Sequence, residues 1–347
     1  MKQYLLPEGG NFYKVNMHSH STLSDGKQTP EELKEAYKAA GYSAVAFTEH
    51  ELMYDLSYLS DDDFIAITSF EYDVCDNEKP PFAFYDEAPH CFDHKQCVHL
   101  NLYAKAPHEN AMICYNPKYL WPVQKDQEDK VKYIGEPDFK RVFTIESINE
   151  VIREAHMQGM LVVYNHPTWS LNTWDIYTKL EGLDGLEIAN GASDIASDLD
   201  YTPYVYDQMA RAGHRMICVA GDDNHNTAHF FKAWTMIKAE SLTYENLFEG
   251  LKKGNCYASQ GPEIFELYTE TTEDNKRFVS IKTSPLAAGI FMTTAGRRKG
   301  FKLAGDNGLI SEARFEIKSE DYYFRISVRD ASGKHANTRI YYLDELN

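Results

Sequence analysis

Short apolar segments that end in a histidine or a carboxylate recur along the first two thirds of this 347-residue chain. The segment at 44–47 is followed within three residues by His50, the one at 64–70 by Glu71, and the one at 216–221 by Asp223. Apolar runs of this length between turn residues predict buried strands. In parallel α/β barrels, the carboxyl ends of several strands together form one active site. The recurrence therefore predicts an α/β barrel whose strand ends share one pocket.

The most compact group of candidate metal ligands lies near the start of the chain. His18 and His20 are two residues apart at the end of an expected strand at 14–18, and Asp25 follows in the next loop. Side chains two apart on a strand point the same way, so both imidazoles can reach one ion. A pair with this spacing also arises by chance among 13 histidines. Taken alone, the pair leaves a structural role equally open.

Further histidines and carboxylates at expected strand ends favour a metal centre over ordinary core histidines. Nine side chains form this candidate metal set: His18, His20, Asp25, His50, Glu71, His99, His166, Asp223 and His225. A ligand set of imidazoles and carboxylates without a thiolate suits Zn, Fe or Mn and does not discriminate among them.

Together these motifs resemble the polymerase and histidinol phosphatase (PHP) domain over roughly residues 14–260. The matching segments are His18-Ser19-His20, Ser24-Asp25-Gly26, Thr48-Glu49-His50, Glu71, His99, Asn165-His166-Pro167 and Gly221-Asp222-Asp223-Asn224-His225. The resemblance implies a distorted seven-stranded, TIM-like β/α barrel with two or three divalent metals. It also implies hydrolysis of phosphoesters.

The resemblance implies a ligand assignment for each ion. The first metal would be held by His18, His20, Glu71 and Asp223, the second by Asp25, His50 and His225, and a third by His99 and His166 with Glu71 as the bridge. Two residues depart from the family pattern: Glu49 stands where Asp is usual, and Asp222 stands where Ser is common. Asp222 leaves two adjacent carboxylates as candidates, and the Asp-x-His spacing favours Asp223.

The first functional hypothesis is a metal-dependent phosphoesterase of class EC 3.1 that acts on a small phosphate ester or nucleotide. Its nucleophile would be a metal-bridging hydroxide, with Asp25, His50 and His225 as the catalytic residues. The segments 99–101, 185–191 and 254–262 resemble the branch of the family that includes aryl carbamate hydrolases. A carboxylate, amide or carbamate ester hydrolase is therefore the first alternative, and a metal-binding protein without catalysis is the second.

Charge limits the partners of the chain. The formal net charge is −18, and the longest basic cluster is Arg297-Arg298-Lys299. Duplex-binding proteins concentrate Lys and Arg, so a long nucleic acid is excluded and a small anionic or ester substrate is expected. The chain has no apolar run of membrane-spanning length. We expect a cytoplasmic protein, with a signal peptide removed and replaced by Met1 as the alternative.

The sequence pattern divides the chain near residue 260. Strands alternate with helices in 1–260, with insertions near 73–97 and 105–140, whereas 261–347 alternates at period two and predicts a small antiparallel β domain. This β domain is expected to have a structural role, such as a homo-oligomer contact, with substrate recognition as the alternative. The insertions are long enough to be lids.

Several other polar residues are candidates for supporting roles. Glu49, Asn165, Asp222 and Asn190 could orient ligands, and His229 and Lys232 could contact an anionic substrate, although ordinary polar roles are the alternative for each. Trp169 and Trp174 could shape an apolar pocket or pack under a loop. The six cysteines have no regular spacing and are expected to be reduced thiols. A separate zinc site in the segment 90–99, with its paired Cys and His residues, is the competing hypothesis.

Overall fold

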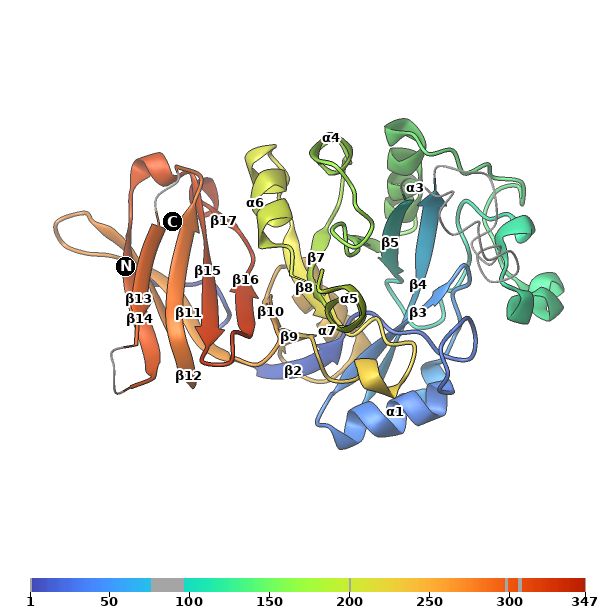
Figure 1. Ribbon diagram of the computed structural model, residues 1–347, viewed down its shortest axis with the longest axis horizontal. Helices are drawn as coiled ribbons and strands as arrows, with labels where there is room; N and C mark the ends of the chain where they lie inside the picture. The colour runs from blue at the N-terminus through green and yellow to red at the C-terminus, as the bar shows by residue number, and fades with distance from the viewer. Residues whose placement is uncertain (1, 76–96, 200, 297–298, 305–307, 347) are drawn as a thin grey trace.

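A computed structural model describes residues 2–75, 97–199, 201–296, 299–304 and 308–346 of the chain. It is a mixed α/β structure with a large sheet. Figure 1 shows the α/β part and the C-terminal strands side by side along the longest axis. The expected insertion at 73–97 and the competing zinc site fall mostly outside the described residues. The expected β domain at 261–347 stays a prediction as a separate unit.

Seven strands of the first part pair with one another in chain order, and six of them carry or precede a candidate ligand. They are β2 (Asn11–Asn16), β3 (Ala44–His50), β4 (Ile65–Cys75), β5 (Cys97–Tyr103), β6 (Leu161–Tyr164), β7 (Gly185–Asn190) and β8 (Ile217–Gly221). β2, β3 and β4 pair in parallel, and so do β6, β7 and β8. β5 runs antiparallel to both β4 and β6. The side chains on β3, β4, β7 and β8 are nearly all buried, as expected for strands covered on both faces.

The expected seven-stranded barrel differs from the observed sheet, which is curved but not closed. β9 (Trp234–Ala239) pairs antiparallel with β2. Between β8 and β9, the Thr235 hydroxyl accepts a hydrogen bond from Ala220 N at 2.9 Å and donates one to Ala220 O at 3.0 Å. The other edge of β9 pairs with β10 (Cys256–Ser259), so the described contact between β8 and β9 is made by this side chain and not by a backbone ladder.

Helices cover this sheet. They are α1 (Pro30–Ala39), α3 (Ile145–Met157), α4 (Trp174–Tyr177), α5 (Gly191–Ser197), α6 (Pro203–Arg211) and α7 (Tyr244–Lys252). α1 begins with a capping box, in which the Thr29 side chain accepts from Glu32 N and the Glu32 side chain accepts from Thr29 N. No helix among the described residues is long and apolar enough to span a membrane.

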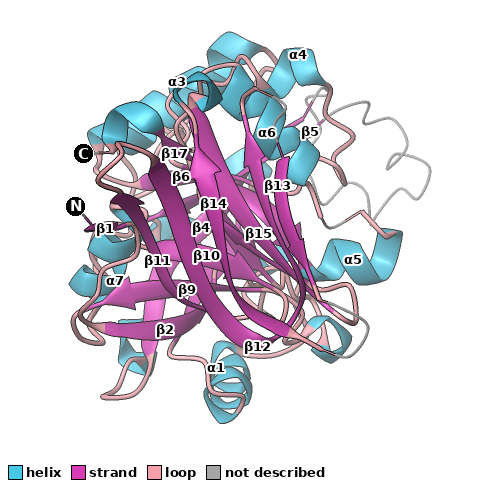
Figure 2. Cartoon of the chain, turned by 90° about the vertical axis from the view of Figure 1, so that its left-hand side faces the viewer, coloured by secondary structure: helices cyan, strands magenta, loops and turns pink. Residues whose placement is uncertain are grey.

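The C-terminal strands form an antiparallel assembly with its own apolar core. They are β10 (Cys256–Ser259), β11 (Ile264–Thr271), β12 (Arg277–Thr294), β13 (Lys299–Leu303), β14 (Ile310–Ile317), β15 (Tyr323–Asp330), β16 (His335–Thr338) and β17 (Tyr341–Tyr342). Figure 2 looks onto these strands, with the long β12 running through the assembly. β1 (Lys2–Tyr4) pairs with β11, and Leu5 and Leu6 pack in the same core. The first residues of the chain therefore help to build this assembly.

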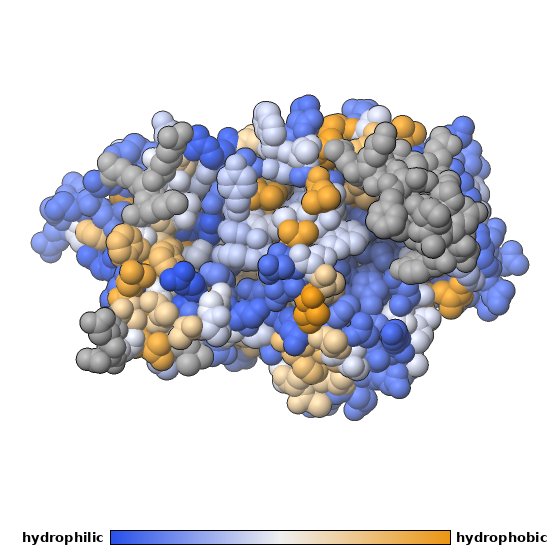
Figure 3. Space-filling view, viewed as in Figure 1, coloured by the Kyte–Doolittle hydropathy of each residue, from blue (hydrophilic) through white to orange (hydrophobic). Residues whose placement is uncertain are grey.

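The second expected insertion, 105–140, is packed against the body of the protein. It contains the 3-10 helices η3 (Pro117–Tyr119) and η4 (Pro122–Lys130). Met112, Ile113 and Leu120 are buried in the largest hydrophobic core. Around these cores the surface is mainly hydrophilic on the face seen in Figure 3.

One expectation about the cysteines is wrong. Cys75, at the end of β4, and Cys97, at the start of β5, form a disulfide, so they are not reduced thiols. The two residues lie directly opposite each other in the antiparallel ladder, which brings their side chains together although 22 positions separate them. Sequence spacing could not reveal this pairing. Cys114, Cys218 and Cys256 are buried free thiols.

Candidate metal centre

The structure brings all nine side chains of the candidate metal set to one place. His50 ends β3, Glu71 and His99 lie within β4 and β5, and the others follow β2, β6 and β8. Most of the nine are buried, and His225 is the most exposed, with 29% of its side chain accessible. Residues from both ends of the α/β part therefore meet in a single cluster.

The two imidazoles of the first ligand set lie close to each other and to both of its carboxylates. His18 Nε2 and His20 Nε2 are 3.2 Å apart. Asp223 Oδ1 lies 3.3 and 3.0 Å from these nitrogens, and Glu71 Oε2 lies 3.4 and 3.3 Å from them. Metal–nitrogen bonds of about 2.0 Å in a tetrahedron give edges of about 3.3 Å. His18, His20 and Asp223 therefore have the spacing of three ligands of one divalent ion, and Glu71 lies next to both imidazoles.

A second set surrounds Asp25 more loosely. His225 Nε2 lies 3.1 Å from Asp25 Oδ2, and His50 Nε2 lies 3.8 Å from the same oxygen. Together with His20, these residues can place one donor atom each within 4.8 Å of one another. His20 Nδ1 is buried and has no hydrogen-bond partner in the structure. These residues are also suitable for an ion.

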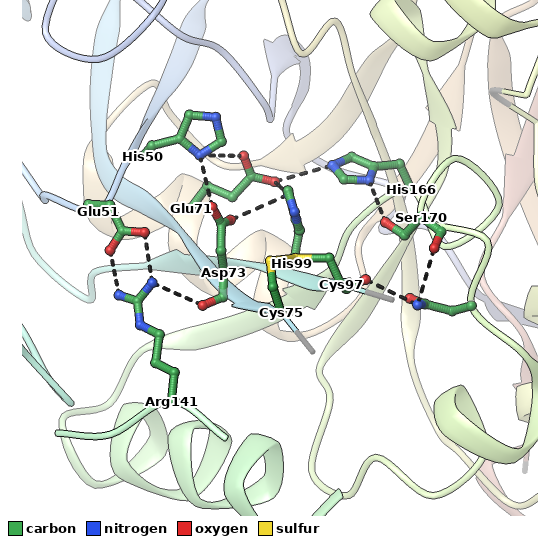
Figure 4. Close-up of a disulfide and its surroundings, with 11 residues drawn as sticks. His50, Glu51, Glu71, Asp73, Cys75, Cys97, His99, Arg141, His166 and Ser170 are labelled. Atoms are coloured by element: carbon green, nitrogen blue, oxygen red, sulfur yellow. Dashed lines mark hydrogen bonds and ion pairs between the residues drawn. A yellow bond between two sulfur atoms is a disulfide. The ribbon is translucent and has the colours of Figure 1, made fainter. Parts of the chain in front are cut away.

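Glu71 connects the first set to a third one. Its Oε2 faces His18 and His20, whereas its Oε1 lies 3.1 Å from His99 Nδ1 and 3.2 Å from His166 Nε2. Figure 4 shows this carboxylate between the imidazoles of His50, His99 and His166. A carboxylate with its two oxygens in different donor sets has the arrangement of a bridging ligand.

Burial and charge act against each other in this cluster. Burial lowers the pKa of His18, but the carboxylates of Asp223 and Glu71 outweigh it and raise that pKa well above its usual value. Burial raises the pKa of Glu71, but His18 and His99 outweigh it and hold that pKa well below its usual range. For His99, Asp73 and Glu71 overcome burial and raise the pKa to about 9. The buried carboxylates thus require positive charge around them.

Two functional candidates were missed by the sequence analysis. Glu187, on β7, lies 3.0 Å from His18 Nδ1 through Oε1, and its Oε2 accepts from His166 N at 3.1 Å. Asp73, two residues after Glu71 on β4, contacts His99 and His50 at 3.4 and 3.6 Å. The sequence contained a signal for each residue. Glu187 is a carboxylate within the apolar strand 185–190, and Asp73 has the period-two spacing from Glu71 that places both on one face of a strand.

The two unusual acidic residues hold loops of the backbone. Glu49 accepts from Ser21 N at 3.0 Å and from Ser24 Oγ at 2.6 Å, so it supports the loop that carries Asp25. Asp222 accepts from the backbone N of Phe231, Lys232 and Ala233 and from the Tyr37 hydroxyl. These bonds engage both of its oxygens away from the cluster, which leaves Asp223 as the carboxylate that faces the imidazoles.

The other supporting candidates divide between the cluster and its rim. Asn165 Nδ2 donates to Glu71 at 2.8 Å, and Asn190 Nδ2 donates to Asp223 at 3.1 Å. His229 Nδ1 accepts from His225 N at 3.2 Å. The Lys232 contact described here is its backbone N–H to Asp222. A substrate role for the last two stays a prediction.

Two tryptophans flank the cluster. Trp121, from the 105–140 segment, stacks on His50 with ring centroids 5.2 Å apart, and Gln124 Nε2 donates to His50 O at 2.6 Å. Trp169 lies edge-on to His99 and His166 and is 45% exposed. Trp174, on α4, is largely exposed. The 105–140 segment therefore supports His50 directly, and Trp169 offers an apolar surface beside the imidazoles.

Comparisons with solved structures give weak overall likenesses. A two-domain protein from Bacteroides vulgatus that contains a predicted PHP-like metal-dependent phosphoesterase is 15% identical, with 98% of each chain covered and a TM-score of 0.45. A proposed metal-dependent phosphoesterase from Bifidobacterium adolescentis is 16% identical, with 64% of this chain and 90% of that chain covered and a TM-score of 0.37. An amidohydrolase from Chromobacterium violaceum is 16% identical, with coverages of 61% and 88% and a TM-score of 0.40. Scores at this level assign neither a fold nor a reaction.

The sequence itself gives the more specific match. No curated protein matched the chain. A family model did match, and the matched segment includes His18, His20, Asp25, His50 and Glu71. Residues 16–96 of the chain thus match the PHP domain family.

Proposed function

We propose that the protein is a metal-dependent hydrolase that cleaves a small phosphate ester. The observation that carries this proposal is the position of Glu71, whose two oxygens face separate sets of imidazoles at 3.1–3.4 Å. Such a bridge is suited to holding two ions close together, the arrangement used for in-line displacement at phosphorus. The PHP domain match over residues 16–96 supports the same class of reaction.

The side chains of the cluster divide the work of holding the ions. His18, His20, Glu71 and Asp223 would hold the first, and Asp25, His50 and His225 would hold the second. When bound, divalent ions lower the pKa of a coordinated water and neutralise charge that develops on the substrate. Zn, Fe and Mn all suit these ligands, because the set contains only imidazoles and carboxylates.

The more exposed side of the cluster is where we place the substrate. His225, with 29% of its side chain accessible, is its most exposed member, so the second ligand set would meet an incoming phosphoryl group first. Trp169 would bind the apolar part of the ester beside His99 and His166, because its ring is partly exposed there. A net charge of −18 makes a small ester a better substrate than a polyanion.

Parallel turnover assays test this proposal. The metal-loaded protein would be assayed with p-nitrophenyl phosphate, bis-p-nitrophenyl phosphate and an aryl methylcarbamate. The His20→Ala variant should lose both bound metal and turnover, whereas His156→Ala should lose neither, because His156 lies outside the cluster and pairs with Asp184. Turnover of the carbamate alone would replace the phosphoesterase with the carbamate hydrolase alternative. Bound metal without turnover of any ester would favour the non-catalytic alternative.

A further inference from the structure

A row of polar side chains lies on one face of the ribbon formed by β4 and β5. In the antiparallel register Glu71 lies opposite Asn101, Asp73 opposite His99, and Cys75 opposite Cys97. Because side chains alternate along a strand, these three pairs point to the same side. The ribbon therefore presents Asp73 and His99 together, one register step beyond Glu71 and toward the disulfide (Figure 4).

Asp73 is buried beside the cluster, and one of its two oxygens accepts no hydrogen bond from the residues that the structure describes. Its side chain is 3% exposed, and its Oδ1 accepts no hydrogen bond in the structure. Oδ1 lies 3.4 Å from His99 Nδ1, and Oδ2 lies 3.6 Å from His50 Nδ1. A buried carboxylate in this state is costly unless positive charge lies next to it.

The backbone around Asp73 is held on both sides. Arg141 Nη1 donates to Asp73 O at 2.9 Å while the same guanidinium pairs with the buried Glu51. The Cys75–Cys97 disulfide links the two strands at the next pair of the same face. Asp73 is therefore fixed opposite His99, as a ligand must be before its ion arrives.

We propose that Asp73 is a ligand of the third metal subsite and completes a set of four donors with Glu71, His99 and His166. The three distances that connect these donors in the structure are 3.1, 3.2 and 3.4 Å. They join His166 to Glu71, Glu71 to His99 and His99 to Asp73, and each is close to the edge of about 3.3 Å of a tetrahedral site, so they account for three of its six edges. This inference rests on the proposed function, since it describes a part of the same centre, and it adds a tenth residue to the candidate metal set.

The other oxygen of Asp73 gives the subsite a second connection. Oδ2 faces His50 Nδ1, which is buried and has no hydrogen-bond partner in the structure. Glu71 Oε2 is 3.4 Å from the same nitrogen. Asp73 and Glu71 thus lie between His50 and His99, so an ion at this position would share its environment with the second ligand set.

Zinc titration of the metal-free protein tests the role of Asp73. Metal content would be measured by mass spectrometry after gel filtration, and affinities by calorimetry. The wild type should bind three equivalents of zinc, and Asp73→Asn should bind two. The affinity for the third equivalent should fall by more than about 100-fold, which is the upper range for the loss of a residue that only supports a ligand. Asp63→Asn, an exposed residue just before β4, is the matched control and should bind three.

The outcomes separate this inference from the proposed hydrolysis. Three tightly bound equivalents in Asp73→Asn, or only two in the wild type, would overturn the ligand role of Asp73 whatever the turnover. Loss of ester turnover in a wild type that binds three equivalents would overturn the proposed function and leave the ligand role standing. If circular dichroism shows that Asp73→Asn does not fold, the same titration would be made with Asp73→Ser, because the smaller serine side chain leaves room for water.

Discussion

Replacing Glu187 by glutamine should weaken the first metal site without removing any of its ligands. In the wild type, Glu187 Oε1 lies 3.0 Å from His18 Nδ1. Its Oε2 accepts from His166 N at 3.1 Å and from Asn190 Nδ2 at 2.9 Å. With the carboxylate as acceptor, His18 carries its proton on Nδ1 and leaves Nε2 free to bind metal.

Glutamine keeps the shape of Glu187 but changes which atoms donate. Its carbonyl oxygen satisfies His166 N and Asn190 only if its NH2 group turns toward His18 Nδ1. The imidazole then moves its proton to Nε2, the atom that faces Glu71 and Asp223. Loss of a supporting carboxylate of this kind costs about 10- to 100-fold in metal affinity, which is about 1.4–2.8 kcal/mol.

Competition with a chelator measures this effect directly. Zinc-loaded wild type and Glu187→Gln would be equilibrated with graded chelator concentrations, and the retained metal would be counted. Glu150→Gln, an exposed change on α3, is the matched control and should behave as the wild type. If Glu187→Gln retains as much zinc as the wild type at the same chelator concentration, the account of the His18 tautomer is refuted.

Three further predictions concern stability. Arg141→Met should lower the free energy of unfolding in urea by about 3–5 kcal/mol, because it leaves the Glu51 carboxylate buried and unpaired, and Arg141→Met with Glu51→Met should recover most of the loss. The double variant Cys75→Ser with Cys97→Ser should lose about 3 kcal/mol from the entropy of the released loop, and equal urea midpoints would contradict this. Burial and Arg329 lower the pKa of His335 from 6.5 to about 4, so the folded state disfavours its protonation. Wild-type stability should therefore fall as pH drops from 6.5 to 4, and His335→Gln should flatten this part of the pH profile.

The local part of the site could be predicted from sequence because strand ends are recognisable there. His18 and His20 follow β2, His50 ends β3, and Asp223 follows β8, as the apolar runs indicate. The resemblance to the PHP domain added the division of these residues among ions, which spacing alone does not provide. The structure brings these residues together, and their metal binding stays a proposal.

The rest depended on pairing between distant strands, which local patterns do not contain. The apolar pattern of 98–103 does not distinguish a parallel from an antiparallel strand, so the reversal of β5 was not expected. That reversal is what places Asp73 opposite His99 and Cys75 opposite Cys97. Glu187 was missed because its partner, His18, is 169 positions away in the sequence and meets it only in the folded chain. The open sheet follows from β9, whose two edges pair with β2 and with β10 and leave no backbone ladder to β8, an arrangement that periodicity cannot predict.

The disulfide between β4 and β5 has a consequence for the accuracy of assembly. A slip of one residue in the pairing of two strands turns every side chain of one strand to the opposite face. In this ribbon such a slip would leave Glu71 and Asp73 on one face and His99 on the other. The covalent link at Cys75 and Cys97 excludes that misaligned pairing once it forms. The disulfide thus stabilises the strand register in which Glu71, Asp73 and His99 lie on the same face of the ribbon, toward the candidate metal centre.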